Sequence, residues 1–247
     1  MYTFVLILLL LTLPARAQTP PEALRVGLPV DYPPFASFDS TRKTWSGFDV
    51  EVLENFAASQ HRRFEPVPMR WKNLLDDLAA GRFSLAGGGI TITPERAARF
   101  DFSAPVLRDG KTPLAPCEKA QRFATLAEID RPGVRVITNP GGQNEAFDRA
   151  HFSRATIIVY PDNRGIFAAL AAGKADLMIT DAVEARYQAR RHPALCAVHP
   201  ENPFSHGEKA YLLVRDAGLR EAINRFLAES ARDATLAALR LKWLGEN

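Results

Sequence analysis

LAAGRFSL at residues 78–85 and LAAGKADL at residues 170–177 are near copies of each other, 92 residues apart. In both segments a helical apolar pattern runs into a glycine and a short apolar stretch follows, which predicts a helix that ends at the glycine and then a strand. Chance similarity in a chain rich in Ala and Leu is the alternative. The two copies nevertheless hold the same place in the surrounding pattern, which favours two structurally equivalent lobes.

Strand-like and helix-like segments alternate around each copy. The predicted strands cover residues 24–28, 64–69 and 84–90, and then 134–138, 157–161 and 177–180. The predicted helices cover residues 48–60, 72–80 and a segment that opens at Thr93-Pro94, and then 144–152, 163–172 and 181–191. This alternation is typical of parallel sheets covered by helices. We therefore predict an α/β protein with two lobes, each a mostly parallel sheet flanked by helices, and a ligand cleft between them.

The chain is expected to cross between the lobes twice. Two helices, predicted at residues 219–231 and 233–244, should return to pack on the first lobe, so the crossings fall near residues 111–117 and 203–209. Lobe 1 would then comprise residues 18–111 with 206–247, and lobe 2 residues 112–205.

Composition and charge exclude several classes of protein. The 247 residues are 47% hydrophobic and 24% charged, as in ordinary globular proteins. The net charge is +3 and no run of Lys and Arg exceeds two residues, which argues against nucleic acid as a partner. The five histidines form no i,i+4 pair and no HExxH motif, so we expect neither a metal site nor a cofactor.

The N-terminus has the pattern of an export signal. The apolar run TFVLILLLLTL at residues 3–13 is too short for the roughly 20 residues of a membrane span, and Ala15-Arg16-Ala17 after it resembles a cleavage site. We interpret residues 1–17 as a signal peptide and expect a periplasmic protein without membrane attachment after cleavage. A buried N-terminal strand or helix is the alternative.

The predicted export bears on how the two cysteines are interpreted. Cys117 and Cys196 form no CxxC motif, so neither a zinc site nor a redox motif is indicated. In an oxidising compartment an even pair is most simply one disulfide, although two free thiols are the alternative.

Candidate cation and loop residues lie where the predicted strands end. Ligands of open α/β sheets sit beyond the carboxyl ends of the strands, so residues 89–96 and 180–184 should face each other across the cleft. Arg96 would offer a carboxylate a bidentate partner, or would be an ordinary surface arginine. Lys111, on a crossing segment, could add a second positive charge. The glycine-containing turn at residues 139–144 could bind an anion through backbone N–H groups, or be a plain tight turn.

Two acids and three aromatic residues complete the candidates. Asp181 and Glu184 lie at i,i+3 in one helical turn, and such acids often do no more than stabilise the N-terminus of a helix. A carboxyl group shielded from water in the cleft could instead keep its proton near neutral pH and act as a general acid. Trp71, Phe35 and Tyr32 could stack on a planar ligand or belong to the core.

The sequence from Leu24 to Trp243 resembles the type II periplasmic solute-binding proteins for polar amino acids, notably at Gly47-Phe48-Asp49-Val50 and at residues 91–96. The resemblance implies a periplasmic-binding-protein-like fold, a carboxylate held by Arg96, and an ammonium group held by Asp181. Further stretches are similar to the cyclohexadienyl dehydratases, periplasmic enzymes built on this scaffold, which convert prephenate to phenylpyruvate and arogenate to phenylalanine. The stretches are residues 107–113, 139–145, 161–163, 173–178, 180–186, 195–200 and 208–213.

The second resemblance implies residue roles. It places the general acid at Glu184 and both cysteines where those enzymes have theirs. We expect the substrate's carboxylates at Arg96 and at the loop of Gly141, Gly142, Gln143 and Asn144, with help from Lys111, and the amino group of arogenate at Asp181. Gly89 and Thr91 would line the same site, and Trp71, Phe35 and Asp31 would surround the ring. The alternative is an amino-acid-binding subunit of an ABC importer, which would have a permease as its partner and no catalysis.

Overall fold

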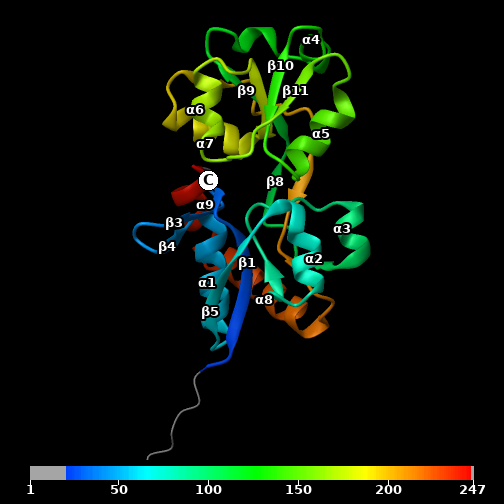
Figure 1. The fold of residues 1–247 in the computed structure, drawn as a ribbon. Coiled ribbons are helices and arrows are strands. Elements are labelled where there is room, and N and C mark those ends of the chain that lie inside the picture. Colours follow the sequence, from blue (N-terminus) through cyan, green and yellow to red (C-terminus); the bar gives the residue numbers. More distant parts are fainter. Residues whose placement is uncertain (1–20, 246–247) are drawn as a thin grey trace, which may run out of the picture.

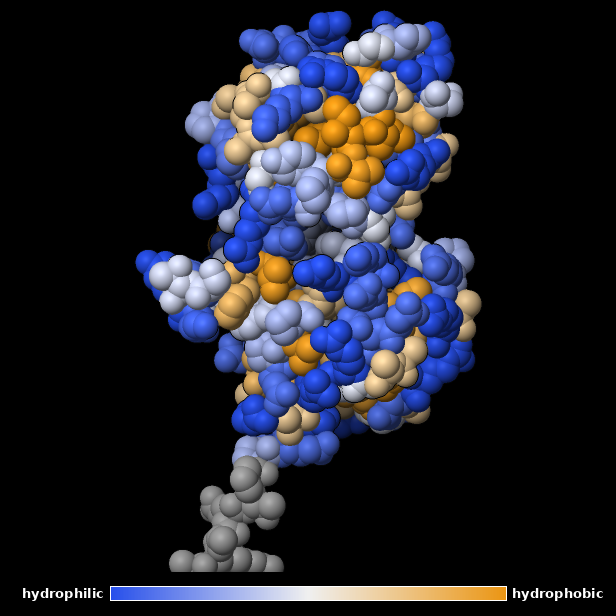
Figure 2. All heavy atoms as spheres, viewed as in Figure 1, coloured by the Kyte–Doolittle hydropathy of each residue, from blue (hydrophilic) through white to orange (hydrophobic). Residues whose placement is uncertain are grey.

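The computed structural model describes residues 21–245, so the predicted signal peptide at residues 1–17 lies outside the described part of the chain. The chain forms two α/β lobes, one above the other in Figure 1, each built around a five-stranded sheet. The space-filling view shows the molecule narrowing between them (Figure 2). None of the helices within residues 21–245 is both long and apolar enough to cross a membrane.

Lobe 1 contains the sheet with the strand order β5-β1-β6-β15-β7. β1 pairs in parallel with β5 and with β6, whereas β15 runs antiparallel to its neighbours β6 and β7. The strands are β1 Ala23–Pro29, β5 Arg63–Met69, β6 Leu85–Ala86, β7 Asp101–Phe102 and β15 Leu212–Leu213. A small antiparallel sheet of β2 Asp31–Tyr32, β3 Ala36–Asp39 and β4 Thr44–Ser46 lies beside them.

Lobe 2 repeats this plan. Its sheet has the order β11-β10-β12-β9-β13, in which β10 pairs in parallel with β11 and β12, as β1 does with β5 and β6 in lobe 1. The strands are β9 Lys111–Pro116, β10 Arg135–Thr138, β11 Thr156–Val159, β12 Leu177–Asp181 and β13 Leu195–Ala197. Two equivalent lobes are therefore confirmed.

Helices cover both sheets. They are α1 Phe48–Ser59, α2 Leu74–Ala79, α3 Pro94–Arg99, α4 Leu126–Ile129, α5 Gln143–His151, α6 Ile166–Ala171, α7 Ala182–Arg191, α8 Ala217–Arg232 and α9 Thr235–Leu244, with 3-10 turns at Trp71–Asn73 and Ala120–Arg122. The last two helices pack on α1 of lobe 1, as expected from the sequence. Two antiparallel strands, β8 Leu107–Asp109 and β14 Gly207–Lys209, run between the lobes (Figure 1). The residue limits of the lobes stay a prediction, although Lys111, placed last in lobe 1, is the first residue of β9.

The repeated segments behave alike in both lobes. α2 ends at Ala79 and α6 at Ala171, and Gly81 and Gly173 follow with φ of +69° and +75°. A side chain is disfavoured in this left-handed conformation, which explains a glycine at both helix ends.

Several predicted elements have different limits in the structure. The predicted helix 72–80 begins as a 3-10 turn, and the predicted helix 163–172 begins only at Ile166, because the Asp162 carboxylate accepts the N–H groups of Arg164 and Gly165. The predicted strand 84–90 is limited to Leu85–Ala86. Beyond it, the N–H groups of Gly88 and Gly89 bind a side chain instead of a strand.

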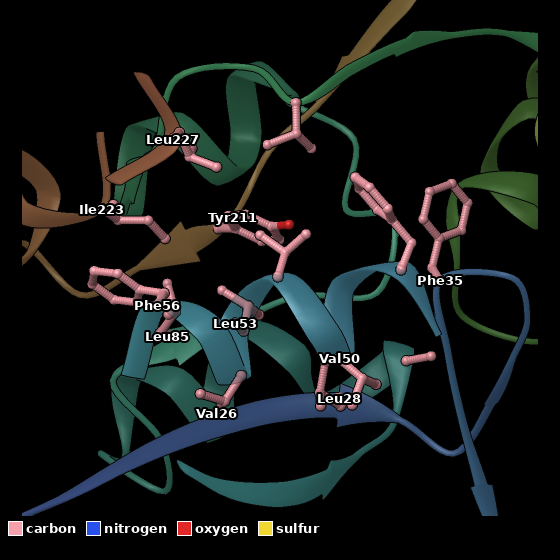
Figure 3. Close-up of a cluster of buried hydrophobic side chains, with 14 of the residues drawn as sticks. Val26, Leu28, Phe35, Val50, Leu53, Phe56, Leu85, Tyr211, Ile223 and Leu227 are labelled. Carbon is pink, nitrogen blue, oxygen red and sulfur yellow. The ribbon is translucent and has the colours of Figure 1, made fainter. Parts of the chain in front are cut away.

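That side chain is Asp49, at the start of α1. Its Oδ2 accepts the N–H of Gly88 at 2.6 Å and of Gly89 at 2.7 Å, and the Tyr211 hydroxyl donates to its Oδ1 at 3.0 Å. Figure 3 shows Tyr211 among apolar side chains from β1, α1 and α8, including Val26, Leu53 and Ile223. The core of lobe 1 thus fixes a loop that leads to the cleft.

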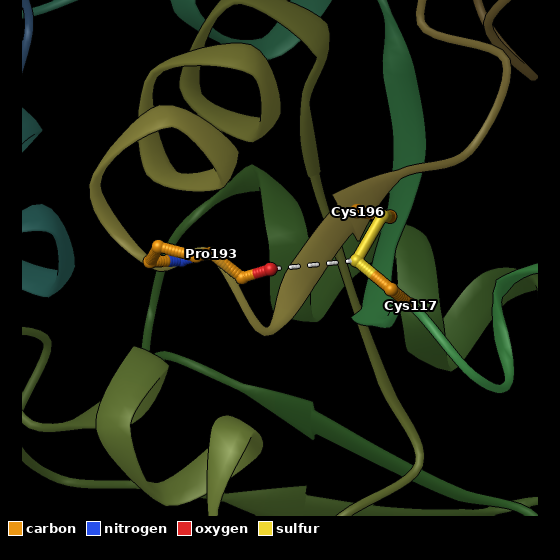
Figure 4. Close-up of a disulfide and its surroundings, with 3 residues drawn as sticks. All are labelled: Cys117, Pro193 and Cys196. Carbon is orange, nitrogen blue, oxygen red and sulfur yellow. Dashed lines mark hydrogen bonds between the residues drawn. A yellow bond between two sulfur atoms is a disulfide. The ribbon is translucent and has the colours of Figure 1, made fainter.

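Lobe 2 is cross-linked by the predicted disulfide. Cys117 and Cys196 are bonded across β9 and β13, with a Cα–Cα distance of 4.8 Å, which decides between the two readings of the pair. Figure 4 shows the bridge at the end of these strands, where the Pro193 carbonyl lies 3.8 Å from the Cys117 sulfur.

Candidate active site

A small cavity lies between the lobes. Lobe 1 contributes Tyr32, Trp71, Gly89, Thr91 and Arg96 to its lining, and lobe 2 contributes Lys111, Asn139, Gly142, Gln143, Asn144 and Asp181. The structure therefore brings together most of the site residues expected from the sequence. The lining residues of lobe 1 lie between residues 32 and 96 and those of lobe 2 between residues 111 and 181, and Figure 1 shows these segments in separate lobes.

Arg96 is a buried cation in this cavity. Thr93 caps α3 by accepting the N–H of Arg96, and Pro94 occupies the first helical position, as the sequence predicts. The side chain is 6% exposed, and its guanidinium donates to the Thr91 carbonyl at 2.7 Å. Among residues 21–245 no carboxylate forms an ion pair with it, and burial lowers its pKa. A buried guanidinium that carboxylates attract without forming an ion pair is suited to binding an anionic ligand.

The loop before α5 provides the opposite wall. Gly142 is the N-cap residue of α5, and Gly142, Gln143 and Asn144 line the cavity at the positive end of this helix. Gly141, however, donates its N–H to the Glu145 carboxylate at 2.7 Å and does not line the cavity. Of the predicted anion-binding loop of residues 141–144, only residues 142–144 line the cavity.

Asp181 forms the centre of a charged network. Its Oδ1 accepts from Lys111 Nζ at 2.7 Å, and its Oδ2 accepts from Lys209 Nζ at 2.5 Å and from the Tyr32 hydroxyl at 2.6 Å. Burial would raise the pKa of Asp181, but the two lysines outweigh it and hold the pKa well below its usual value. Asp181 is therefore a carboxylate at any pH at which the protein works.

Glu184 lies behind the cavity wall. It is completely buried on the first turn of α7, rather than partly shielded at the cleft, and it does not line the cavity. Its Oε2 accepts from the Thr180 hydroxyl, and its Oε1 has no hydrogen-bond partner within the described chain. The Asn144 amide donates to the same Thr180 hydroxyl at 3.2 Å. Asn144 and Thr180 therefore connect the carboxyl group to the cavity.

The environment of Glu184 keeps its carboxyl group protonated. Burial raises its pKa to about 8, and the nearby Asp181 charge adds to this rise, although the Thr180 hydrogen bond opposes it. At neutral pH Glu184 is thus a neutral acid that holds a transferable proton, which is what a general acid requires.

Phe35 and Asp31, like Gly141 and Glu184, lie outside the cavity lining. Phe35 is 1% exposed and packs beneath Gly89, where a Cβ would approach its ring to 2.7 Å. Asp31 lines a neighbouring groove, and its carbonyl accepts from the Asn163 side chain of lobe 2 at 2.7 Å. Phe35 shapes the loop of Gly89, and Asp31 takes part in a contact between the lobes.

Sequence reasoning missed Lys209 and did not single out Asn139. Lys209 lies on β14 and is 2% exposed, and besides Asp181 its ammonium group contacts the Thr91 hydroxyl at 2.9 Å. The position of Lys209 beside Asp181 depends on how strand β14 crosses between the lobes, and no local sequence pattern indicates it. Asn139 lines the cavity and accepts from the Asn144 amide at 3.0 Å. Within the described residues, no group of three His, Cys, Asp or Glu side chains could hold a metal ion.

Comparison with known proteins adds independent information. The family model described as bacterial extracellular solute-binding proteins, family 3, matches residues 24–246. Cyclohexadienyl dehydratase from Pseudomonas aeruginosa is 47% identical over 221 residues, which cover 90% of this chain and 82% of that protein. The L-cystine-binding protein TcyJ from Escherichia coli is 29% identical over 223 residues, with the same coverage.

Solved structures give the same picture. The crystal structure of an ancestral amino acid-binding protein, described as a precursor of cyclohexadienyl dehydratase, matches with a TM-score of 0.83 and 30% identity over 90% of this chain and 95% of that one. An ancestral cyclohexadienyl dehydratase matches with a TM-score of 0.55 and 44% identity over 90% of this chain and 92% of that one. The chain belongs to the bacterial extracellular solute-binding proteins, family 3, and within them to the cyclohexadienyl dehydratases.

Proposed function

We propose that this protein catalyses the decarboxylating dehydration of prephenate to phenylpyruvate, and that it can convert arogenate to phenylalanine in the same way. The observation that carries the proposal is the completely buried Glu184, whose pKa is raised to about 8, behind a cavity in which no carboxylate of residues 21–245 forms an ion pair with Arg96. A site that only binds and releases an amino acid has no need of a buried proton donor. The 47% identity to a cyclohexadienyl dehydratase supports the same function.

The reaction needs little more than a proton and a fixed substrate. The bond between the ring and its carboxylate breaks and releases CO₂, and its electron pair enters the ring. The hydroxyl group on the opposite ring carbon leaves with a proton from Glu184 as water, and the ring becomes aromatic. Water then returns a proton to the Glu184 carboxylate. General acid catalysis typically contributes about 10²–10⁴-fold, and positioning of the substrate adds to it.

The cavity residues would position the substrate. Arg96 would bind one carboxylate, and the N-terminus of α5 at Gly142 and Gln143 the other, while Trp71 flanks the ring. Because Asn144 and Thr180 separate Glu184 from the cavity, these side chains must shift when the substrate binds, so that the acid reaches the leaving hydroxyl.

The proposed location is the periplasm. The family is extracellular, and residues 1–17 would be removed as a signal peptide during export. The disulfide between Cys117 and Cys196 suits an oxidising compartment.

The test is turnover of prephenate by the purified protein, followed as phenylpyruvate formation. We expect wild-type activity, and a loss of about 10²–10⁴-fold in kcat for Glu184→Gln, which keeps the shape of the side chain but supplies no acidic proton. Glu54→Gln on the exposed face of α1 is the matched control and should keep full activity. Absence of turnover in wild type would refute the proposal and favour a binding subunit of an ABC importer. Full activity of Glu184→Gln would remove only the assigned acid.

A further inference from the structure

Two lysines and a tyrosine of the protein already occupy three of the hydrogen-bond acceptor positions of Asp181. A carboxylate has about four acceptor positions. Lys209 and the Tyr32 hydroxyl occupy both positions of Oδ2, and Lys111 occupies one of Oδ1. Asp181 is only 4% exposed, so the protein encloses the carboxylate almost completely.

This arrangement is unfavourable for an α-ammonium group. To reach Asp181, the ammonium group of a ligand would have to displace a lysine or lie beside Lys111 Nζ at the same oxygen, where like charges repel each other in a poorly solvated site. The carbonyl oxygen of a 2-oxo acid would bind favourably at the same place, because it accepts hydrogen bonds from the ammonium groups of the lysines. The two side chains Lys111 and Lys209 thus take the place of a bound ammonium group.

Lys209 and Lys111 differ in the contacts that they make besides Asp181. Lys111 lines the cavity and also donates to Asn144, so its removal would disturb the route to Glu184. The side-chain partners of Lys209 are Asp181 and Thr91, at 2.5 Å and 2.9 Å, and it lines an adjoining cavity on the side of the crossing strands. Its effect can therefore be separated from proton transfer.

We propose that Lys209 is a specificity-determining residue, which occupies the ammonium-binding side of Asp181 and makes the site select the 2-oxo acid prephenate over its 2-amino counterpart arogenate. The inference rests on the proposed dehydratase function. The two substrates differ at one carbon atom, so their ratio reports on this contact alone. The earlier expectation that Asp181 receives the amino group of arogenate is replaced by this assignment.

The experiment compares kcat/KM for prephenate and arogenate in wild type, Lys209→Met and Lys209→Gln. We expect wild type to prefer prephenate, and both variants to lower the ratio of prephenate to arogenate by about tenfold or more, since one charge-assisted hydrogen bond is lost or gained. Lys174→Gln, which changes an exposed lysine of lobe 2, should leave the ratio unchanged. A wild type without preference, or variants that lower both substrates by the same factor, would overturn the proposal.

A binding measurement separates this inference from the proposed function. Calorimetry with phenylpyruvate and L-phenylalanine, which differ in the same group, needs no catalysis. Tighter binding of the 2-oxo acid by wild type, reduced in Lys209→Met, supports the inference even if no substrate is turned over. Tighter binding of the amino acid by wild type overturns it, and this result does not depend on whether the variants fold.

Discussion

A buried carboxylic acid lies near the cleft in each lobe, and the two acids are used in opposite ways. Asp49 of lobe 1 has three donors on its two oxygens, whereas Glu184 of lobe 2 has one donor and an oxygen without a partner within the described chain. Burial raises the pKa of both acids, and the donors of Asp49 oppose that rise. The comparison teaches that a satisfied acid fixes a loop, while an unsatisfied acid retains a proton for chemistry.

The same contrast extends to the two walls of the cavity. The wall of lobe 1 is held by backbone contacts, at the Gly88–Gly89 loop and at the capped helix that carries Arg96. Lobe 2 holds ionisable side chains at or behind its wall, namely Asp181, Glu184 and Lys111. Both lobes thus provide binding groups, and lobe 2 also provides the acid.

Replacement of Asp49 should have the largest effect on stability. Asp49→Ala leaves two backbone N–H groups and the Tyr211 hydroxyl without their acceptor in a closed core, and each unsatisfied group costs about 1–3 kcal/mol. We expect a loss of about 3–5 kcal/mol in the free energy of unfolding, measured by urea denaturation. Asp49→Asn, which keeps one acceptor oxygen, should lose less. Equal stability of Asp49→Ala and wild type would contradict a structural role.

Removal of the disulfide should affect lobe 2 more than lobe 1. The bridge closes a segment with a sequence separation of 79, and a disulfide typically stabilises by about 2–4 kcal/mol through its effect on the unfolded chain. We expect the double variant Cys117→Ala/Cys196→Ala to lower the free energy of unfolding by that amount. Hydrogen exchange should increase more in β9 and β13 than in β1 and β5. Faster exchange in both lobes alike would contradict this assignment.

The fold could be predicted where the decisive signals are local. The glycines at 81 and 173 end their helices with positive φ, and Thr93-Pro94 opens α3, as the sequence indicated. The strand predicted to continue to residue 90 stops early, because Gly88 and Gly89 bind a carboxylate 39 and 40 residues away. A local pattern carries no information about such a partner.

The candidate site likewise contains features that local sequence signals predict and features that depend on distant contacts. The position of Arg96 follows from its helix cap, and its place in the cavity could be expected from the sheet topology. The complete burial of Glu184 and the approach of Lys209 to Asp181 depend on how the lobes and crossing strands pack. These two features could not be predicted from the sequence, because the residues involved lie far apart along the chain.

The smallest expected effect is on the pH dependence of the free energy of unfolding, which tests whether Glu184 differs from Asp49 in keeping a proton. The usual pKa of a glutamate is 4.5, and burial raises that of Glu184 to about 8. Between these values Glu184 binds a proton in the folded state but not in the unfolded state, so its contribution to stability is complete below pH 4.5 and is lost as the pH rises towards 8.

Glu184→Gln removes this dependence, because glutamine does not titrate. Wild type should therefore lose at most about 1.4 kcal/mol per pH unit relative to the variant, or about 2–3 kcal/mol between pH 5 and pH 7. Urea denaturation at several pH values measures the difference. Asp148, whose pKa burial also raises to about 8, is present in both proteins and cancels. A difference that does not change with pH would mean that Glu184 is ionised in the folded protein, and the contrast with Asp49 would then have no basis in proton binding.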